Sequence, residues 1–165
     1  MNPNIYLHEI IHIVGAGSEL GDVHRASIAR PDRCDLMVTV VERLEHLPED
    51  WSTALAIVAH PDDMEYGAAS AVARWTSAGK DIRYVLVTRG EAGISTMPPE
   101  AVGPARQQEQ RDSCLAVGVT TVEFLDHRDG LVEAGVELRR DLAAAIRRHR
   151  PDVILSINYR DSWGG

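Results

Sequence analysis

Residues 55–78 read LAIVAHPDDMEYGAASAVARWTSA, and the pattern of apolar residues changes within them. The first five residues are apolar and include branched side chains, which is typical of a short β-strand. From Tyr66 to Ala78, apolar residues recur at spacings of three and four, and Gly79 follows them. That spacing predicts an amphipathic helix, which the glycine ends. The stretch is therefore predicted to begin a series in which strands and helices alternate.

The same alternation continues toward the end of the chain. Three further stretches are short, rich in branched residues and bounded by turn formers: residues 82–88, 121–125 and 153–157. Residues 101–116 and 135–149 have helical periodicity, and Gly118 and Pro151 close them. Alternation of this kind implies right-handed crossovers and a mostly parallel sheet covered by helices on both faces. We therefore predict an α/β fold, a Rossmann-like three-layer sandwich.

Composition and charge limit the class of protein. The 165 residues include 17 Lys+Arg and 25 Asp+Glu, which gives a net charge of −8. A single domain of this length buries about 70% of the surface of its unfolded chain, so it needs no disulfide or structural metal to fold. The basic residues are scattered, whereas nucleic acids and anionic membranes bind clustered Lys and Arg. We therefore expect a small-molecule partner, no nucleic acid and no membrane.

The cysteines and the apolar stretches bear on location. Only Cys34 and Cys114 are present, and their spacing does not resemble a metal site. Their number predicts reduced thiols and a cytoplasmic protein. No apolar stretch approaches the roughly 18–20 residues that span a bilayer. The N-terminus also lacks the pattern of a signal peptide.

The first part of the chain does not continue the alternation. We predict an N-terminal extension of uncertain structure over residues 1–50 and one domain over residues 51–165. Within the extension, residues 10–14 followed by residues 15–21 (GAGSELG) imitate a dinucleotide-binding turn. The third glycine lies one position late, and residues 24–31 are poor helix formers. A nucleotide-binding, Rossmann-like module therefore stays an alternative.

The densest group of polar residues follows the first strand, where residues 60–65 read HPDDME. In open parallel sheets, ligands bind beyond the carboxyl ends of the strands, which is where this segment falls. Imidazole and carboxylate groups suit a zinc-like divalent ion, and a turn at Pro61 could bring His60 and Asp63 to one point. Asp62 would then be free to take a proton from a metal-activated water.

The HPDDME segment resembles the His-Pro-Asp-Asp-x-Glu signature of the PIG-L/LmbE-like zinc-dependent de-N-acetylases, which remove acetyl groups from N-acetylglucosamine-type sugars. Residues 88–93 (TRGEAG) are similar to that family's Thr-x-Gly-Glu-x-Gly segment. Arg106 and Glu109 fit its Arg-x-x-Glu pattern, and residues 150–153 read RPDV, as the family does before its last matching strand. The resemblance begins near residue 54 and continues to the end of the chain.

The resemblance implies a zinc cofactor with His60 and Asp63 as ligands and Asp62 as the catalytic general base. It also implies that Arg89 contacts the substrate. Water deprotonated by Asp62 would attack the acetyl carbonyl, and the metal would stabilise the oxyanion. The expected reaction is hydrolysis of a non-peptide amide, an N-acetyl amino sugar conjugate, to acetate and a free amine.

Other polar residues near strand ends have two interpretations each. Asp129, in a turn after the third strand, is either a partner of a metal ligand or sugar hydroxyl, or only a turn residue. Asn158 and Asp161 follow the fourth strand at the same edge and are candidates for substrate binding in the same way. Glu91 supports either its own turn or the site. Asp129 and Asn158 join Arg89 as our predicted substrate-binding residues.

Structural interpretations also stay open for the motif residues. Asp62 and Glu65 resemble a capping box at the start of the next helix. Arg106 and Glu109 have the i,i+3 spacing of a surface ion pair on one helix. Arg89 is alternatively a solvated charge at the end of a strand. Each of these interpretations would explain its residues without any catalytic role.

One element of the family pattern is missing. The family supplies a third metal ligand, a histidine in an Asp-His segment beyond the fourth strand, and no histidine follows His149 here. His127 is the remaining candidate near a strand end, either as a substitute ligand or as a turn residue. We therefore expect a C-terminally truncated family member, with an inactive fragment that retains residual metal binding as the alternative. An uncovered sheet edge would favour association into a homo-oligomer.

Overall fold

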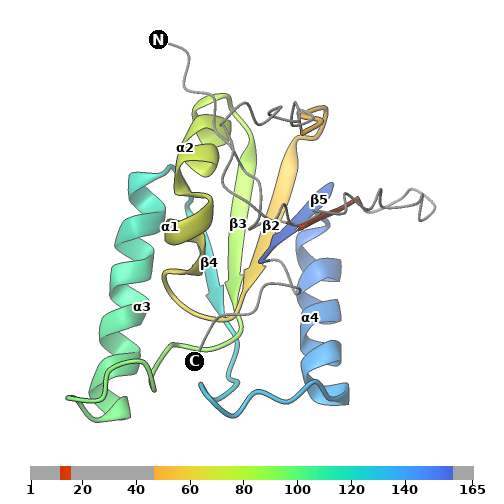
Figure 1. Cartoon of the computed structure of the whole chain (residues 1–165). Helices are drawn as coiled ribbons and strands as arrows, with labels where there is room; N and C mark the ends of the chain where they lie inside the picture. Colours follow the sequence, from red (N-terminus) through yellow and green to blue (C-terminus); the bar gives the residue numbers. More distant parts are fainter. Residues whose placement is uncertain (1–11, 16–46, 158–165) are drawn as a thin grey trace, which may run out of the picture.

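The computed structural model describes residues 12–15 and 47–157 of the chain. The strands are β1 (His12–Gly15), β2 (Thr53–Val58), β3 (Asp81–Leu86), β4 (Thr121–Phe124) and β5 (Val153–Ser156). The helices are α1 (Asp63–Gly67), α2 (Ala69–Ser77), α3 (Pro99–Ala116) and α4 (Val136–His149), as Figure 1 shows. Strands and helices alternate from β2 onward, which confirms the predicted α/β class.

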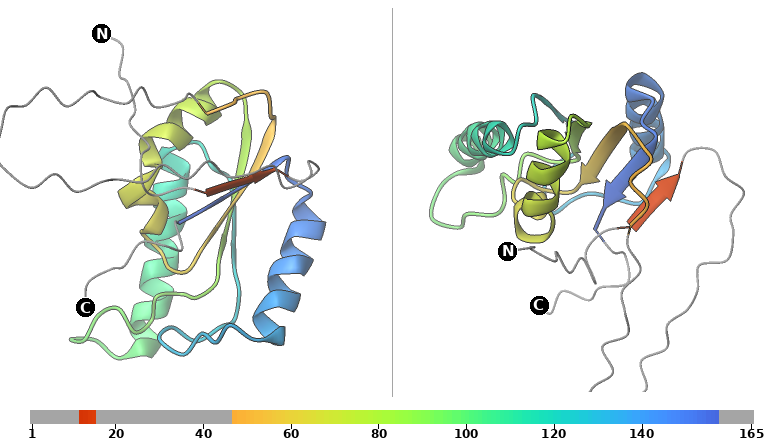
Figure 2. Two further views of the ribbon diagram at one scale, coloured as in Figure 1. Left: turned by 45° about the vertical axis from the view of Figure 1, so that its right-hand side comes forward. Right: turned by 90° about the horizontal axis from the view of Figure 1, so that it is seen from above.

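The five strands form one sheet in the order β1-β5-β2-β3-β4. Strands β2, β3, β4 and β5 run parallel, and β1 pairs antiparallel with β5 at the edge. Helices α1, α2 and α3 lie on one side of the sheet and α4 lies on the other (Figure 2). These are the three layers that the alternation of strands and helices predicted.

The core has two parts, one on each face of the sheet. Tyr84 of β3 is buried in a cluster with Trp75 of α2, whereas the next residue, Val85, is buried with Leu55 of β2 and Ala145 of α4. Neighbouring residues divide in this way because successive side chains of a strand point to opposite faces. Burying one large apolar side chain stabilises the fold by about 1.5–3 kcal/mol. The two clusters therefore hold both helical layers against the sheet.

The single helix predicted over residues 66–78 was wrong, because the structure has two helices there. Helix α1 begins at Asp63, before the predicted start, and α2 follows it after Ala68. Ala68 has φ −139°, outside the helical range, and comes directly after Gly67. Glycine has a low intrinsic helical propensity, so the break falls at the weakest point of the pattern. The short helix α1 carries the end of the HPDDME segment.

Strand β1 comes from the segment for which we predicted an extension. Its direction is opposite to that of the other four strands. Its carboxyl end therefore lies beside the amino ends of those strands. Dinucleotides bind at the carboxyl edge of parallel strands, and the position of β1 therefore gives the nucleotide-binding alternative no support. Residues 1–11, 16–46 and 158–165 lie outside the described part, and so does the rest of the glycine-containing turn. Among the described helices, none is both long and apolar enough to cross a membrane.

Candidate active site

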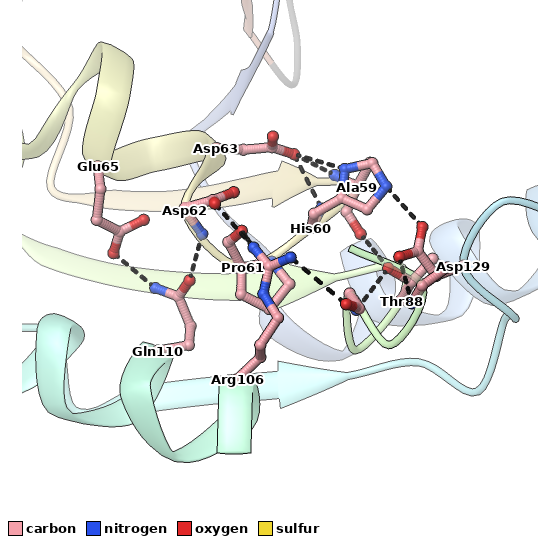
Figure 3. Close-up of polar contacts among 12 residues, drawn as sticks. Ala59, His60, Pro61, Asp62, Asp63, Glu65, Thr88, Arg106, Gln110 and Asp129 are labelled. Carbon is pink, nitrogen blue, oxygen red and sulfur yellow. Dashed lines mark hydrogen bonds and ion pairs between the residues drawn. The ribbon is translucent and has the colours of Figure 1, made fainter. Parts of the chain in front are cut away.

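Three loops meet at the carboxyl edge of the sheet. Val58, the last residue of β2, lies opposite Leu86 of β3, and Leu86 lies opposite Phe124 of β4. Because the three strands are parallel and end at the same level, the loops that follow them leave the sheet side by side. Figure 3 shows that polar side chains from all three loops converge there with side chains from α3.

The loop after β2 is shaped by the carboxylate of Asp63. Its Oδ2 accepts hydrogen bonds from the backbone N–H groups of Ala59 (3.0 Å) and His60 (2.9 Å). The Thr88 hydroxyl at the end of the next strand donates to the Ala59 carbonyl at 3.0 Å. These bonds close a tight turn through Pro61, as the sequence predicted, and bring His60 and Asp63 to the same point. The turn therefore groups the two predicted metal ligands.

The distance between His60 and Asp63 is compatible with their predicted role as two ligands of one zinc ion. Nδ1 of His60 lies 3.7 Å from Oδ2 of Asp63. Ligand bonds of 2.0–2.2 Å in tetrahedral geometry separate two donor atoms by about 3.4 Å. The described residues contain no cluster of three or more His, Cys, Asp and Glu side chains able to hold a metal. The pair therefore fits part of a zinc site, and the remaining ligands would come from residues outside the described part, from a partner or from water.

Asp129 orients the ring of His60. Its Oδ1 lies 2.9 Å from Nε2 of His60, on the side of the ring away from Asp63. Its Oδ2 accepts the Ala92 N–H at 3.0 Å, and its own N–H donates to Oε1 of Glu91 at 2.9 Å. A metal-binding histidine commonly donates its other ring N–H to a carboxylate, which fixes the ring and leaves one nitrogen for the metal. Asp129 and Glu91 therefore join the loops after β3 and β4 to the predicted ligand pair.

Asp62 has an unusual backbone conformation, with φ 87° and ψ −17°. Residues other than glycine rarely adopt this left-handed region, and Asp is among the few that tolerate it. Two residues of α3 hold it: the Asp62 N–H donates to Oε1 of Gln110 at 3.0 Å, and Nη2 of Arg106 donates to Oδ2 of Asp62 at 2.7 Å. The side chain stays 52% exposed. The carboxylate of Asp62 therefore faces the guanidinium of Arg106, whereas that of Asp63 faces the ring of His60 (Figure 3).

The capping-box interpretation of Asp62 and Glu65 was wrong. The Asp62 side chain makes no capping hydrogen bond, and the Asp62 N–H donates to Gln110 rather than to Glu65. Oε1 of Glu65 accepts hydrogen bonds from Nε2 of Gln110 (2.8 Å) and from the Ser113 hydroxyl (2.5 Å). Glu65 thus ties α1 to α3 beneath the loop. It is a structural support for the site rather than a helix cap.

The surroundings separate the acidities of the two adjacent carboxyl groups. Burial alone would raise the pKa of Asp63, but the neighbouring His60 ring and hydrogen bonds from two backbone N–H groups hold it below its ordinary value. Burial raises the pKa of Asp62, and the positive guanidinium of Arg106 opposes the rise. The neighbouring Asp63 carboxylate raises the pKa of His60 against the effect of burial, and the Asp129 carboxylate adds to the rise. The two adjacent carboxyl groups therefore have pKa values shifted in opposite directions.

The surface ion pair predicted between Arg106 and Glu109 was also wrong. The side chain of Arg106 is only 15% exposed and its guanidinium bonds to Asp62 and to the Pro61 carbonyl (2.7 Å). Glu109 is exposed, and within residues 47–157 it forms no ion pair with Arg106. The sequence did carry a signal that we missed: Arg106 and Gln110 are four residues apart and therefore share one face of α3.

The remaining predicted residues have different surroundings. Arg89 follows β3 at the carboxyl ends of the strands, pairs with Asp126 and is 46% exposed, so both of its interpretations stay open. His127 gains no support as a substitute third ligand: its Nε2 lies 3.1 Å from Oδ2 of Asp141 on α4, and among the described residues it forms no metal-binding cluster with the predicted ligand pair. Asn158 and Asp161 lie outside the described residues. Their predicted roles stay predictions.

Residues 55–164 match the family model described as PIG-L: GlcNAc-PI de-N-acetylase. A curated relative, the diacetylchitobiose deacetylase of Thermococcus kodakarensis, is 29% identical over 116 residues. That match covers 69% of this chain and 42% of the relative. The N,N'-diacetylchitobiose deacetylase from Pyrococcus horikoshii, solved with its inhibitor, superposes with a TM-score of 0.60 at 28% identity, over 62% of this chain and 39% of that one.

A solved structure with another activity is similar to nearly the same extent. GalB, the 4-carboxy-2-hydroxymuconate hydratase from Pseudomonas putida KT2440, superposes with a TM-score of 0.57 at 28% identity, over 62% of this chain and 45% of that one. The chain therefore spans less than half the length of each of these three proteins. The family model matches more than half of the chain and confirms the resemblance found in its motifs. This chain belongs to the PIG-L family of GlcNAc-PI de-N-acetylases.

Proposed function

We propose that this chain forms the zinc-binding part of an N-deacetylase that hydrolyses the N-acetyl amide of an N-acetylglucosamine-type conjugate. The observation that carries the proposal is that the HPDDME segment places two of its polar side chains together and the third apart from them. His60 and Asp63 face each other at 3.7 Å, whereas the neighbouring carboxylate of Asp62 lies apart from them and is half exposed. Family membership and the deacetylase activity named for two relatives support the same reaction.

Asp62 would act as the proton acceptor. Arg106 occupies its Oδ2, and Oδ1 accepts no hydrogen bond from the described residues, so Oδ1 is the oxygen available to a water. Asp62 takes one proton of that water while the water oxygen forms a bond to the acetyl carbon. The C–N bond then breaks, the departing nitrogen takes up the proton that Asp62 removed from the water, and acetate and a free amine are released.

Zinc held by His60 and Asp63 would polarise the amide carbonyl and lower the pKa of water. The chain's own contribution is to keep both ligands in place. Asp63 is fixed by two backbone N–H groups, and the His60 ring is fixed by Asp129. For Asp129 we therefore favour the role of a partner of His60 over direct binding of a sugar hydroxyl, because both of its oxygens are engaged within the protein.

For substrate binding, Arg89 is the candidate that the structure describes best. It follows β3 at the same edge as His60, and its guanidinium is half exposed although it pairs with Asp126. A guanidinium in this position can donate to the hydroxyl or carbonyl oxygens of a sugar. Asn158 stays a second candidate by its place after β5. The proposed substrate is a small amino sugar conjugate in the cytoplasm.

Hydration is a second candidate function, because GalB is a hydratase and is 28% identical to this chain, the same identity as the deacetylase from Pyrococcus horikoshii. A carboxylate that takes a proton from water serves both reactions. The products differ, since hydration adds water to a carbon–carbon double bond and releases no acetate. Product analysis therefore separates the two activities.

The test is acetate release from N,N'-diacetylchitobiose by the 165-residue chain with zinc added. We expect turnover by the wild type and its loss in Asp62→Asn, because the amide keeps the size of the side chain but cannot accept the proton. Asp112→Asn on the exposed side of α3 is the matched control and should retain turnover. If zinc is bound and no acetate or amine forms, the chain is not an active deacetylase by itself and the inactive-fragment alternative holds.

A further inference from the structure

We propose that Arg106 is a positioning residue that sets the orientation of the Asp62 carboxylate, and that Gly90 and Gly93 serve to make room for its guanidinium. The inference rests on the proposed function, in which Asp62 is the proton acceptor. It assigns a role to the Arg-x-x-Glu and Thr-x-Gly-Glu-x-Gly segments that the ligand pair leaves unexplained.

The guanidinium of Arg106 joins two loops that are far apart in sequence. Its Nη2 donates to the Pro61 carbonyl and to Oδ2 of Asp62, both at 2.7 Å. Its Nη1 lies 3.4 Å from the Gly90 carbonyl in the loop after β3. With 15% of the side chain exposed, the cation is largely removed from water, so these acceptors replace its hydration. The group therefore has a defined position rather than a mobile surface location.

Two glycines leave the space that this guanidinium fills. A Cβ placed on Gly93 would come within 2.3 Å of Nη1 of Arg106, and one placed on Gly90 would lie 3.0 Å from three of its atoms. Gly90 also has φ 66°, which favours glycine for a second reason. The nearest atoms belong to the end of a flexible side chain, so a methyl group at Gly93 would displace the guanidinium rather than the backbone. That substitution moves Arg106 without removing it.

The position of Arg106 matters because α3 holds Asp62 at two points. Gln110, one turn further along α3, accepts the Asp62 N–H at 3.0 Å and supports the left-handed backbone. Arg106 holds the side chain by one oxygen and leaves Oδ1 for the water. Without Arg106, the carboxylate would be free to rotate about its side-chain bonds, and Oδ1 and Oδ2 would exchange places.

The experiment compares Arg106→Met, Arg106→Lys and Gly93→Ala with the wild type, and uses Arg111→Met as the matched control. Arg111 lies on the same helix, but its guanidinium stacks over Phe124, 5.2 Å from the ring centre, and it makes no contact with Asp62. The first readout is the NMR signal of the Asp62 carboxyl carbon and of its amide. The second is acetate release, with kcat and KM determined separately. Dispersion of the remaining amide signals reports whether each variant is folded.

We expect the Asp62 signals to move in Arg106→Met and in Gly93→Ala, and to stay in place in Arg111→Met. Gly93→Ala added to Arg106→Met should move them no further, because the displaced group is then absent. Misplacing a catalytic group by about 1 Å can cost about 100-fold in rate, so we expect kcat to fall by up to that factor while KM changes little. Arg106→Lys keeps a cation but lacks the second terminal nitrogen that contacts the Gly90 carbonyl, and should recover only part of the loss.

Two results would overturn the proposal: Asp62 signals that do not move in folded Arg106→Met, or independent, additive effects of Gly93→Ala and Arg106→Met. Failure of the proposed function has a different signature, which is a wild type that releases no acetate. In that case the NMR measurement still decides whether Arg106 and the glycines hold Asp62.

Discussion

Two carboxylates at opposite edges of the sheet make nearly the same backbone contacts. At the carboxyl edge, Oδ2 of Asp63 accepts two backbone N–H groups from the end of β2, at 3.0 and 2.9 Å. At the amino edge, Oδ2 of Asp152 accepts the N–H groups of Ser52 and Thr53 at the start of β2, at 2.9 and 2.8 Å. In both places these bonds lower the pKa of the carboxyl group.

The surroundings of the two carboxylates differ. Asp63 faces the ring of His60 and adjoins a second carboxylate, that of Asp62. Asp152 receives one further hydrogen bond, from the Thr53 hydroxyl at 3.0 Å, and joins the beginning of β2 to that of β5. Asp63 and Asp152 both lie in segments that resemble the family. A motif match alone therefore does not distinguish a metal ligand from a strand clamp, which here means a carboxylate that only joins two strands by hydrogen bonds. The position of each carboxylate does distinguish them, because parallel sheets bind ligands at the carboxyl ends of their strands.

A matched pair of substitutions, Asp63→Asn and Asp152→Asn, tests this comparison through its effect on zinc affinity. An amide keeps an oxygen that can accept the backbone bonds but loses the charge that a metal ligand needs. We expect Asp63→Asn to weaken zinc binding by more than about 100-fold, the upper limit for loss of a residue that only supports a ligand. Asp152→Asn should bind zinc as the wild type does. Titration calorimetry with zinc measures both affinities.

His60→Ala belongs in the same titration as a positive control, because it removes the other predicted ligand. Wild-type zinc affinity in Asp63→Asn would mean that the metal binds elsewhere and that Asp63 is a strand clamp like Asp152. Weak and nonspecific zinc binding by the wild type would contradict the zinc site in this chain altogether.

A smaller effect on zinc affinity is expected at the carboxylates that orient histidines. Asp129 lies 2.9 Å from Nε2 of His60, and Asp141 lies 3.1 Å from Nε2 of His127, so the two pairs have matching geometry. We expect Asp129→Asn to lower zinc affinity by about 10–100-fold, because the ring of a ligand loses its partner. Asp141→Asn should leave it unchanged. A fall in Asp141→Asn of the same size would return His127 to the set of ligands.

The sequence predicted the four parallel strands, the layers and the HPDDME segment, but not β1, because these four strands depend on local periodicity and on residues adjacent in the chain. It left open which side chains meet across loops, and it offered Asp129 as a partner of a metal ligand only as one of two interpretations. The contact between His60 and Asp129 depends on the register of β2, β3 and β4, which apolar patterns leave open. Which residues the Arg106 side chain contacts depends on the angle at which α3 packs on the sheet. The i,i+3 spacing of Arg106 and Glu109 was a local signal that a tertiary contact overrode.

The smallest predicted effect is on stability and its dependence on pH, at Asp152. Because hydrogen bonds from Ser52 and Thr53 lower the folded-state pKa of Asp152, the contact stabilises the fold fully only above the unfolded value of about 3.9. The contribution is lost as the pH falls through the lower folded-state value. Asp152→Asn should therefore be less stable than the wild type at pH 7, with a difference that shrinks below pH 4.

Urea unfolding of the wild type and Asp152→Asn at neutral and acid pH measures this difference. The side chain is exposed, so water competes for its bonds and the effect is modest. The unfolding measurement is interpreted together with the zinc titration. Asp152→Asn should lower the free energy of unfolding and leave the zinc affinity unchanged. If Asp152→Asn instead weakened zinc binding and left unfolding unchanged, the amino edge would take part in the site, and the rule that separates the two carboxylates would not hold for this protein.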